Sequence, residues 1–108
     1  MKKGEIWSVE LPLSVGHEQT GTRPAVIMAD LEANICIIIP ITSNIQALRF
    51  PHTIEIKKSE RNGLETDSVG LIFQLRAIDK SRLKKKAGDL ENSILTQIDD
   101  VIKKILGI

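Results

Sequence analysis

The chain has 108 residues and a mass of 12.0 kDa, with 42% hydrophobic and 27% charged residues. This length fits one small domain, residues 1–108, and excludes a two-domain enzyme, while the composition gives no indication of disorder or a disulfide scaffold. The 15 Lys and Arg residues are balanced by 14 Asp and Glu residues, so no global field indicates a nucleic-acid partner, and such binding would have to be local.

Sequence features relevant to the cellular compartment favour the cytoplasm. No apolar run approaches the ~18–20 residues of a membrane-spanning helix, and the first residues lead into no apolar segment of the signal-peptide type. The one cysteine, Cys36, lies inside the apolar run 35–39 and has no partner for an internal disulfide. We therefore expect a soluble cytoplasmic protein with no membrane association.

The first half of the chain predicts three strands. Residues 5–11 alternate between apolar and polar side chains and predict a half-buried strand that ends at Pro12. Residues 13–23 mix glycines with polar side chains and predict a loop long enough to carry function. The two apolar runs 24–29 and 35–39, joined by a short connection, predict paired central strands.

Pro40 has no N–H for a ladder hydrogen bond, so we expect pairing to stop near Ile41, leaving Thr42 and Ser43 at a strand end. Residues 53–57 alternate again and predict a fourth strand, followed by a turn at Asn62-Gly63.

The last third of the chain predicts one strand and one helix. Residues 68–78 predict a long fifth strand, with Phe73 on an apolar face that packs into the core. Basic residues at 80–86 predict a solvated charged turn. Apolar residues recur at three- and four-residue spacing from 94 to 106, with Asn92 as the expected N-cap and Gly107 as the expected stop.

The short connections between these strands favour antiparallel pairing, because a parallel pair needs a crossover of about a dozen or more residues. We therefore expect a mainly β fold: a small antiparallel, partly closed barrel with one C-terminal α-helix.

Candidate functional residues meet where the 13–23 loop approaches the end of the third strand. If the two apolar strands form a hairpin, Arg23 and Thr42 lie at the same end of the ladder. A guanidinium beside hydroxyls binds phosphate well, and His17 could move a proton near neutral pH. Alternatively, Arg23 caps strand carbonyls or pairs with Glu18, and His17 is an ordinary exposed loop residue.

Four ordered blocks of this sequence resemble a known family. Residues 4–7 (GEIW), 16–24 (GHEQTGTRP), 40–43 (PITS) and 67–79, with Asp67-Ser68-Val69 and Gln74-Leu75-Arg76-Ala77-Ile78-Asp79, are similar to the successive signatures of the PemK/MazF mRNA interferases. These proteins are the toxins of type II toxin-antitoxin pairs. The resemblance spans nearly the whole chain.

The resemblance implies an SH3-like barrel of the PemK/CcdB type, a homodimer, and metal-independent cleavage of single-stranded RNA without a cofactor. In that chemistry the ribose 2′-hydroxyl attacks the adjacent phosphate and leaves a 2′,3′-cyclic phosphate and a 5′-hydroxyl. Arg23 matches the family's catalytic arginine and Thr42 its catalytic threonine. Glu18 or His17 could serve as the base, and the sequence leaves both open. The residues expected to bind RNA are Gln19, Gly21, Ser43, Gln74 and Arg76.

Two features depart from the family pattern. Some members carry an acidic residue directly before the position of Gln74, where this chain has Phe73. The connection 30–34 is also shorter than in many members, in which a longer loop helps to shape the RNA groove. Two histidines 35 positions apart and one buried cysteine supply no spacing typical of a metal site.

The resemblance also implies a cognate antitoxin whose acidic, disordered tail folds over a surface around Arg23, Arg76 and Lys84. Two other functions remain open. One is a non-catalytic toxin of the same barrel type that acts on DNA gyrase, as the related CcdB family is understood to do. The other is an inactive barrel that only binds an antitoxin or nucleic acid.

Overall fold

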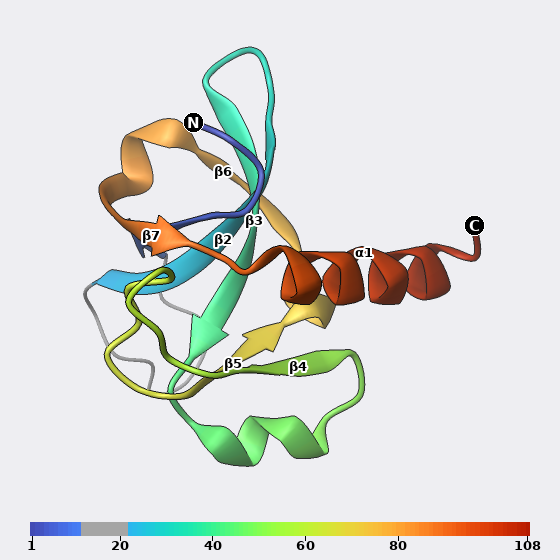
Figure 1. Cartoon of the computed structure of the whole chain (residues 1–108). Coiled ribbons are helices and arrows are strands. Elements are labelled where there is room, and N and C mark those ends of the chain that lie inside the picture. The colour runs from blue at the N-terminus through green and yellow to red at the C-terminus, as the bar shows by residue number, and fades with distance from the viewer. Residues whose placement is uncertain (12–21) are drawn as a thin grey trace.

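The computed structural model describes residues 1–11 and 22–108, and it is mainly β with one C-terminal α-helix (Figure 1). The elements in chain order are β1 (Glu5–Glu10), β2 (Thr22–Asp30), β3 (Ile35–Thr42), η1 (Ile45–Arg49), β4 (Thr53–Ile56), β5 (Ser68–Leu71), η2 (Ile72–Gln74), β6 (Arg76–Asp79), η3 (Lys80–Arg82), β7 (Leu83–Asp89) and α1 (Asn92–Leu106), where η denotes a 3-10 helix.

All described strand pairs are antiparallel, in the order β4-β5-β3-β2-β1-β7, and β6 also pairs with β3. Strand β3 is central to the sheet, because it pairs with β2 along one edge and with β5 and β6 along the other. The sheet curls around the core without closing, since its end strands β4 and β7 are not neighbours in that order. The expected antiparallel, barrel-like fold with a C-terminal helix is confirmed.

The predicted central hairpin is also confirmed. Ile27 faces Ile38 across β2 and β3, and Ala25 faces Pro40. Pro40 forms the last pair with β2, as its missing N–H predicts, and β3 then continues through Thr42 by pairing with β5. The connection turns back with Ala33 and Asn34 at φ values of 60° and 62°.

The prediction of one long strand over 68–78 is wrong. Ile38 and Ile41 are three positions apart along β3, whereas their partners Arg76 and Gly70 are six positions apart. The extra residues form the 3-10 turn η2, which interrupts the strand and rotates its side chains. Phe73 is therefore 46% exposed instead of packing into the core, and its ring lies 6.3 Å from that of Phe50.

The prediction of a solvated charged turn over 80–86 is correct for the short 3-10 turn at 80–82 but wrong for residues 83–86. Residues from Leu83 onward form β7, which pairs with β1 at the edge of the sheet. An edge strand tolerates a run of lysines because much of it faces water, and lysine on an edge also discourages pairing with other chains. Lys80 and Lys86 form ion pairs with Asp30 and with Glu5 and Asp89, respectively.

Helix α1 packs its apolar face on the sheet and projects its C-terminal end beyond it (Figure 1). Ile98 is fully buried there, and Gly107 ends the helix at a φ of 72°, as predicted. The N-cap is Glu91, one residue before the expected Asn92. In the part of the chain that the structure describes, no helix is long and apolar enough to span a membrane.

Two groups of buried side chains form the core, one on each face of the central hairpin. The larger group lies between the sheet and α1 and contains Ile6, Val26, Met28, Ile39, Ile41, Ile56, Ile72, Leu90 and Ile98. The smaller group contains Val9, Ala25, Ile27, Cys36, Ile38 and Ile78. Because alternate residues of β3 enter both groups, this strand is apolar along nearly its whole length.

Candidate active site

A cleft of about 470 Å³ lies where β1, β2 and β3 meet the segment that precedes β5. Pockets of ~300–1,000 Å³ are the usual size for small-molecule sites. Hydroxyl side chains form much of the lining. The lining residues are Ser8, Thr22, Arg23, Pro24, Ile41, Ser43, Gly63, Leu64, Glu65, Thr66, Ser68 and Ala87.

From the sequence we expected Arg23 in the loop 13–23. The structure places it at the start of β2 instead. It faces Val9 across β1 and is half-buried. The β2–β3 register, continued two residues beyond the Ala25–Pro40 pair, places Arg23 opposite Thr42. The hairpin thus brings these two residues to the same end of the ladder.

Thr42 ends β3, where it faces Val69 of β5 and is half-buried. Its hydroxyl oxygen Oγ1 accepts a hydrogen bond from the backbone N–H of Asn44 at 3.2 Å. This bond leaves the hydroxyl hydrogen able to donate, because a hydroxyl both donates and accepts. Ser43 follows directly and lines the cleft.

A guanidinium and several hydroxyl groups border the cleft, and together they form a set of hydrogen-bond donors suited to an oxyanion. Arg23, Thr22, Ser8 and Ser43 all border the cleft within a few residues of the β2–β3 strand ends. This arrangement can hold a phosphate group and can stabilise charge that develops on its oxygens.

Thr42 is absent from the described lining of the cleft, although its neighbours Ile41 and Ser43 belong to it. The remaining residues expected at the site have different positions. His17, Glu18, Gln19 and Gly21 lie outside the described residues. Gln74 and Arg76 are exposed at the end of η2 and the start of β6, and they are absent from the described lining of the cleft. Arg76 faces Ile38. Ile38 and Thr42 are four positions apart along β3, which corresponds to about 13 Å of strand.

The far wall of the cleft was not predicted from the sequence. It comes from residues 63–66, and the sequence signals near it were the Asn62-Gly63 turn before it and the Asp67-Ser68-Val69 block after it. Gly63 has a φ of 70°, and a Cβ atom there would lie 2.0 Å from the carbonyl oxygen of Ala87. Only glycine therefore fits where this wall meets β7.

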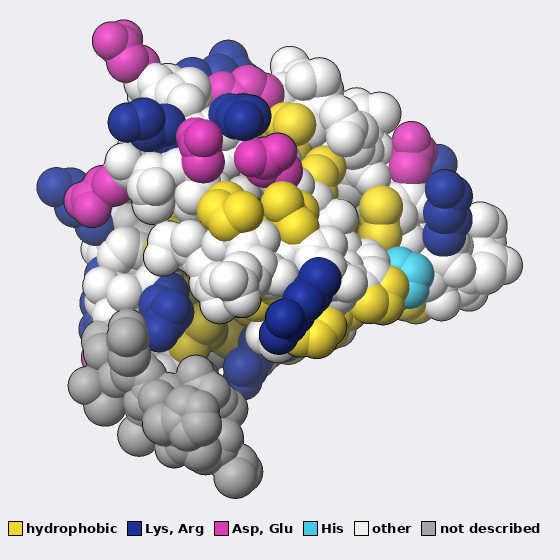
Figure 2. Space-filling model, turned by 90° about the horizontal axis from the view of Figure 1, so that it is seen from below, with side chains coloured by type: hydrophobic (Ala, Val, Ile, Leu, Met, Phe, Trp, Pro, Cys, Tyr) yellow, Lys and Arg dark blue, Asp and Glu magenta, His cyan; other side chains and the backbone are white. Residues whose placement is uncertain are grey.

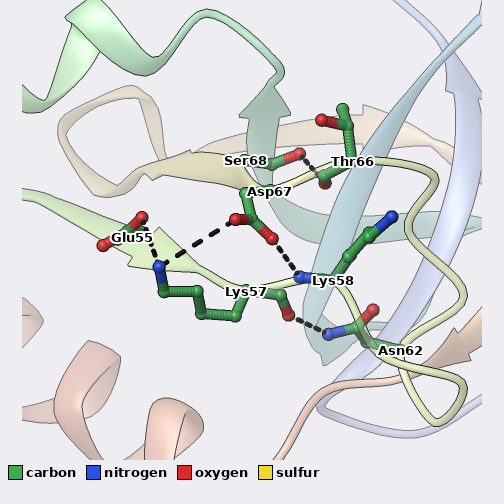
Figure 3. A network of polar contacts seen from close by, with 7 residues as sticks. All are labelled: Glu55, Lys57, Lys58, Asn62, Thr66, Asp67 and Ser68. Carbon is green, nitrogen blue, oxygen red and sulfur yellow. Dashed lines mark hydrogen bonds and ion pairs between the residues drawn. The ribbon is translucent and has the colours of Figure 1, made fainter.

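A network of polar contacts holds this wall in place (Figure 3). The Asp67 carboxylate accepts a hydrogen bond from the backbone N–H of Lys58 at 2.9 Å. The Asn62 amide donates to the carbonyl oxygen of Lys57 at 2.9 Å, and the Ser68 hydroxyl donates to the carbonyl oxygen of Thr66 at 2.9 Å. These bonds tie the two ends of the wall to the residues that follow β4 and to the start of β5.

Helix α1 is joined to the same network through Glu91. Its carboxylate accepts hydrogen bonds from the Ser59 hydroxyl at 2.6 Å and from the Asn62 amide at 3.1 Å. Burial of Glu91 opposes ionisation, but these hydrogen bonds outweigh it and hold the pKa of Glu91 below its usual value. Asn62 itself is fully buried.

Among residues 1–11 and 22–108, no group of three or more His, Cys, Asp and Glu side chains is placed to hold a metal ion. The Cys36 thiol is buried, and burial raises its pKa.

The face seen in Figure 2 carries hydrophobic side chains between Lys and Arg side chains. Exposed apolar residues of the η1 and η2 region include Ile45, Leu48, Phe50, Phe73 and Leu75. The guanidinium of Arg49 stacks on the Phe50 ring, 5.4 Å from its centroid.

The fold and the cleft define a small, barrel-like β protein with an arginine- and hydroxyl-lined site at the end of its central hairpin. The family model of the PemK-like, MazF-like toxins of type II toxin-antitoxin systems matches residues 2–106. This chain belongs to that family.

Individual relatives agree with this assignment. Endoribonuclease EndoA of Bacillus subtilis (strain 168) is 34% identical over 107 residues, which cover 95% of this chain and 91% of the relative. MazF from Deinococcus radiodurans has the same fold, with a TM-score of 0.79 at 19% identity over 100% of this chain and 97% of its own. An endoribonuclease in complex with its cognate antitoxin, from a mycobacterial species, matches with a TM-score of 0.66 at 14% identity over 98% and 92% of the chains.

Proposed function

We propose that this chain is an endoribonuclease toxin that cleaves single-stranded mRNA at short sequence motifs without a metal cofactor. The family match over residues 2–106, with a relative named an endoribonuclease at 34% identity, is the observation that carries the proposal. The cleft supports it, because Arg23 and Ser43 line a space that can hold a phosphate group.

In the proposed reaction, the 2′-hydroxyl oxygen forms a bond to the adjacent phosphorus while the bond to the 5′-oxygen breaks. A base takes the proton of the 2′-hydroxyl, and the leaving 5′-oxygen takes up a proton. Arg23 donates to the phosphoryl oxygens as their negative charge grows, and Thr42 adds a hydroxyl donor. The products are a 2′,3′-cyclic phosphate and a 5′-hydroxyl. Either Glu18 or His17 is proposed as the base.

We further propose that two copies of the chain form a homodimer with a shared RNA groove. Single-stranded RNA would extend from the cleft over Gln74 and Arg76, which are exposed. Both residues lie beside the edge of β3 that pairs with β5 and β6. A cognate antitoxin with an acidic, disordered tail would cover this surface, since the mycobacterial relative was solved with its own antitoxin. Light scattering that shows a monomer with cleavage intact would contradict the dimer.

The proposal is tested by incubating the purified protein with a long RNA in EDTA and by identifying the end groups of the products. Cyclic phosphate and 5′-hydroxyl ends are expected. Arg23→Ala should lower the single-turnover rate about a hundredfold or more, which is typical when one donor to a developing anion is removed. Its free energy of unfolding should stay within about 1 kcal/mol.

Arg61→Ala is the matched control, because it removes the same charge from an exposed residue outside the cleft lining. Its rate should remain near that of the wild type. A normal rate in Arg23→Ala would refute the site. Unfolding of Arg23→Ala would instead indicate that Arg23 holds the fold together.

A further inference from the structure

Arg23 and Glu65 are the charged residues in the described lining of the cleft. Glu65 is exposed, and within residues 1–11 and 22–108 its carboxylate contacts no cation and accepts no hydrogen bond. Two other acidic residues differ in this respect, because Asp67 on the same segment and Glu91 at the start of α1 both accept hydrogen bonds from the chain itself. The carboxylate of Glu65 is therefore available to a molecule in the cleft.

The backbone on both sides of Glu65 is fixed. The N–H of Leu64 donates to the Asn62 side-chain oxygen at 3.0 Å. The carbonyl oxygen of Thr66 accepts a hydrogen bond from the Ser68 hydroxyl at 2.9 Å, as Figure 3 shows. A residue that distinguishes one base from another has to be held in place in this way. Its carboxylate can disfavour the wrong base only if its position is fixed.

The two charges divide the cleft between different parts of a nucleotide. A phosphate is attracted to Arg23 and repelled by a carboxylate, so the phosphate belongs at the Arg23 end. The Glu65 end then faces a base or a sugar, and the unpaired bases of single-stranded RNA present their hydrogen-bonding edges there.

We propose that Glu65 is a specificity-determining residue that selects a base with an exocyclic amino group and disfavours uracil at one position of the cleaved motif. An ionised carboxylate only accepts hydrogen bonds, so it matches the amino groups of cytosine, adenine and guanine. Uracil has no amino group, and its one donor on this edge, N3–H, lies between two carbonyl oxygens, so a carboxylate that accepts from N3–H is repelled by these neighbouring acceptors. This inference rests on the proposed endoribonuclease function.

The test compares cleavage of RNAs in which the base at each position around the cut is varied. The wild type should disfavour uracil at one position by about tenfold or more, the range typical of a direct base contact. Glu65→Gln should reduce this preference towards unity at that position alone, because an amide both donates and accepts. Glu65→Asp, which keeps the carboxylate, should retain the direction of the preference.

Glu60→Gln is the matched control, since Glu60 is exposed on the same segment and is outside the cleft lining. It makes the same change in charge and should leave the base preference unchanged.

Cleavage by Glu65→Gln with unaltered preference would overturn the inference and leave the proposed function standing. A uniform loss of rate on all RNAs, with the base preference unaltered, would also overturn it and would assign Glu65 to the chemical step. A wild type that cuts no RNA would refute the proposed function itself.

Discussion

Replacing Asn62 with alanine tests whether the wall of the cleft is held by a buried amide. The Asn62 side chain makes four hydrogen bonds. Its oxygen accepts from the backbone N–H groups of Ser59 and Leu64, both at 3.0 Å. Its nitrogen donates to the carbonyl oxygen of Lys57 at 2.9 Å and to Glu91 at 3.1 Å. Asn62→Ala would leave all four partners without this side chain.

The magnitude follows from the kinds of bond that are lost. A neutral hydrogen bond contributes about 0.5–1.5 kcal/mol net, and one to a charged group about 1.5–3 kcal/mol. Water reaches some of these half-buried groups after the substitution, so the loss falls near the lower end of the sum. We expect the free energy of unfolding to fall by about 3 kcal/mol, which lowers the melting temperature by about 10–20 °C.

The assay is urea unfolding followed by the fluorescence of Trp7, the one tryptophan of the chain. Asn44→Ala is the matched control, because the exposed Asn44 side chain accepts a single hydrogen bond from Gln46 at 3.1 Å and caps η1. That loss should be about 1 kcal/mol. An Asn62→Ala variant no less stable than Asn44→Ala would refute the reasoning about the buried amide.

Three further predictions concern stability and reactivity. Gly88→Ala should lower the free energy of unfolding by about 1–3 kcal/mol in the same urea assay, because its Cβ would lie 2.4 Å from a backbone carbonyl oxygen. The control is Gly107→Ala, whose Cβ would have no atom within 4 Å and which should show only the cost of its left-handed backbone. Equal losses of stability in the two variants would contradict the clash at Gly88. Cys36 should react with a thiol reagent only as fast as the chain unfolds, because the thiol is buried and its pKa is raised, so rapid labelling of the folded protein would be inconsistent with this burial. The hydrogen bond from Trp7 holds the pKa of Glu5 below its usual 4.5, so this carboxylate stabilises the fold at neutral pH and loses that effect as the pH falls through the lowered pKa. Between about pH 7 and pH 3, the melting temperature should fall less steeply in Glu5→Gln than in the wild type. Parallel curves would argue against a stabilising role of the Glu5 carboxylate.

The sequence predicted the elements whose signals are local. The continuous apolar runs at 24–29 and 35–39 predicted the central hairpin, and three- and four-residue spacing predicted α1. The interruption at η2 could not be predicted, because residues 68–78 alternate regularly and only their pairing to two parts of β3 produces the turn. Strand β7 was missed because its lysines resemble a solvated turn.

The candidate site was predictable where it depends on the hairpin. Pairing of β2 with β3 was enough to bring Arg23 and Thr42 to one end of the ladder. The wall at 63–66 was not predictable, because it depends on contact between distant segments, such as Gly63 against Ala87. Phe73 shows the same limit, since its exposure follows from the turn at η2 and not from its own neighbours in the sequence.

The pairing of β1 with β7 determines when this fold can form during protein synthesis. Val9 faces Leu83, so the two strands are separated by about 74 residues, or roughly 4–15 s of translation at 5–20 residues per second. Ala87 packs against Gly63 of the cleft wall, and Gly88 packs against Arg61 and Asn62 just before it. The ribosome must therefore synthesise the chain through Gly88 before the cleft exists, and a partner that recognises the finished cleft can bind only after that point.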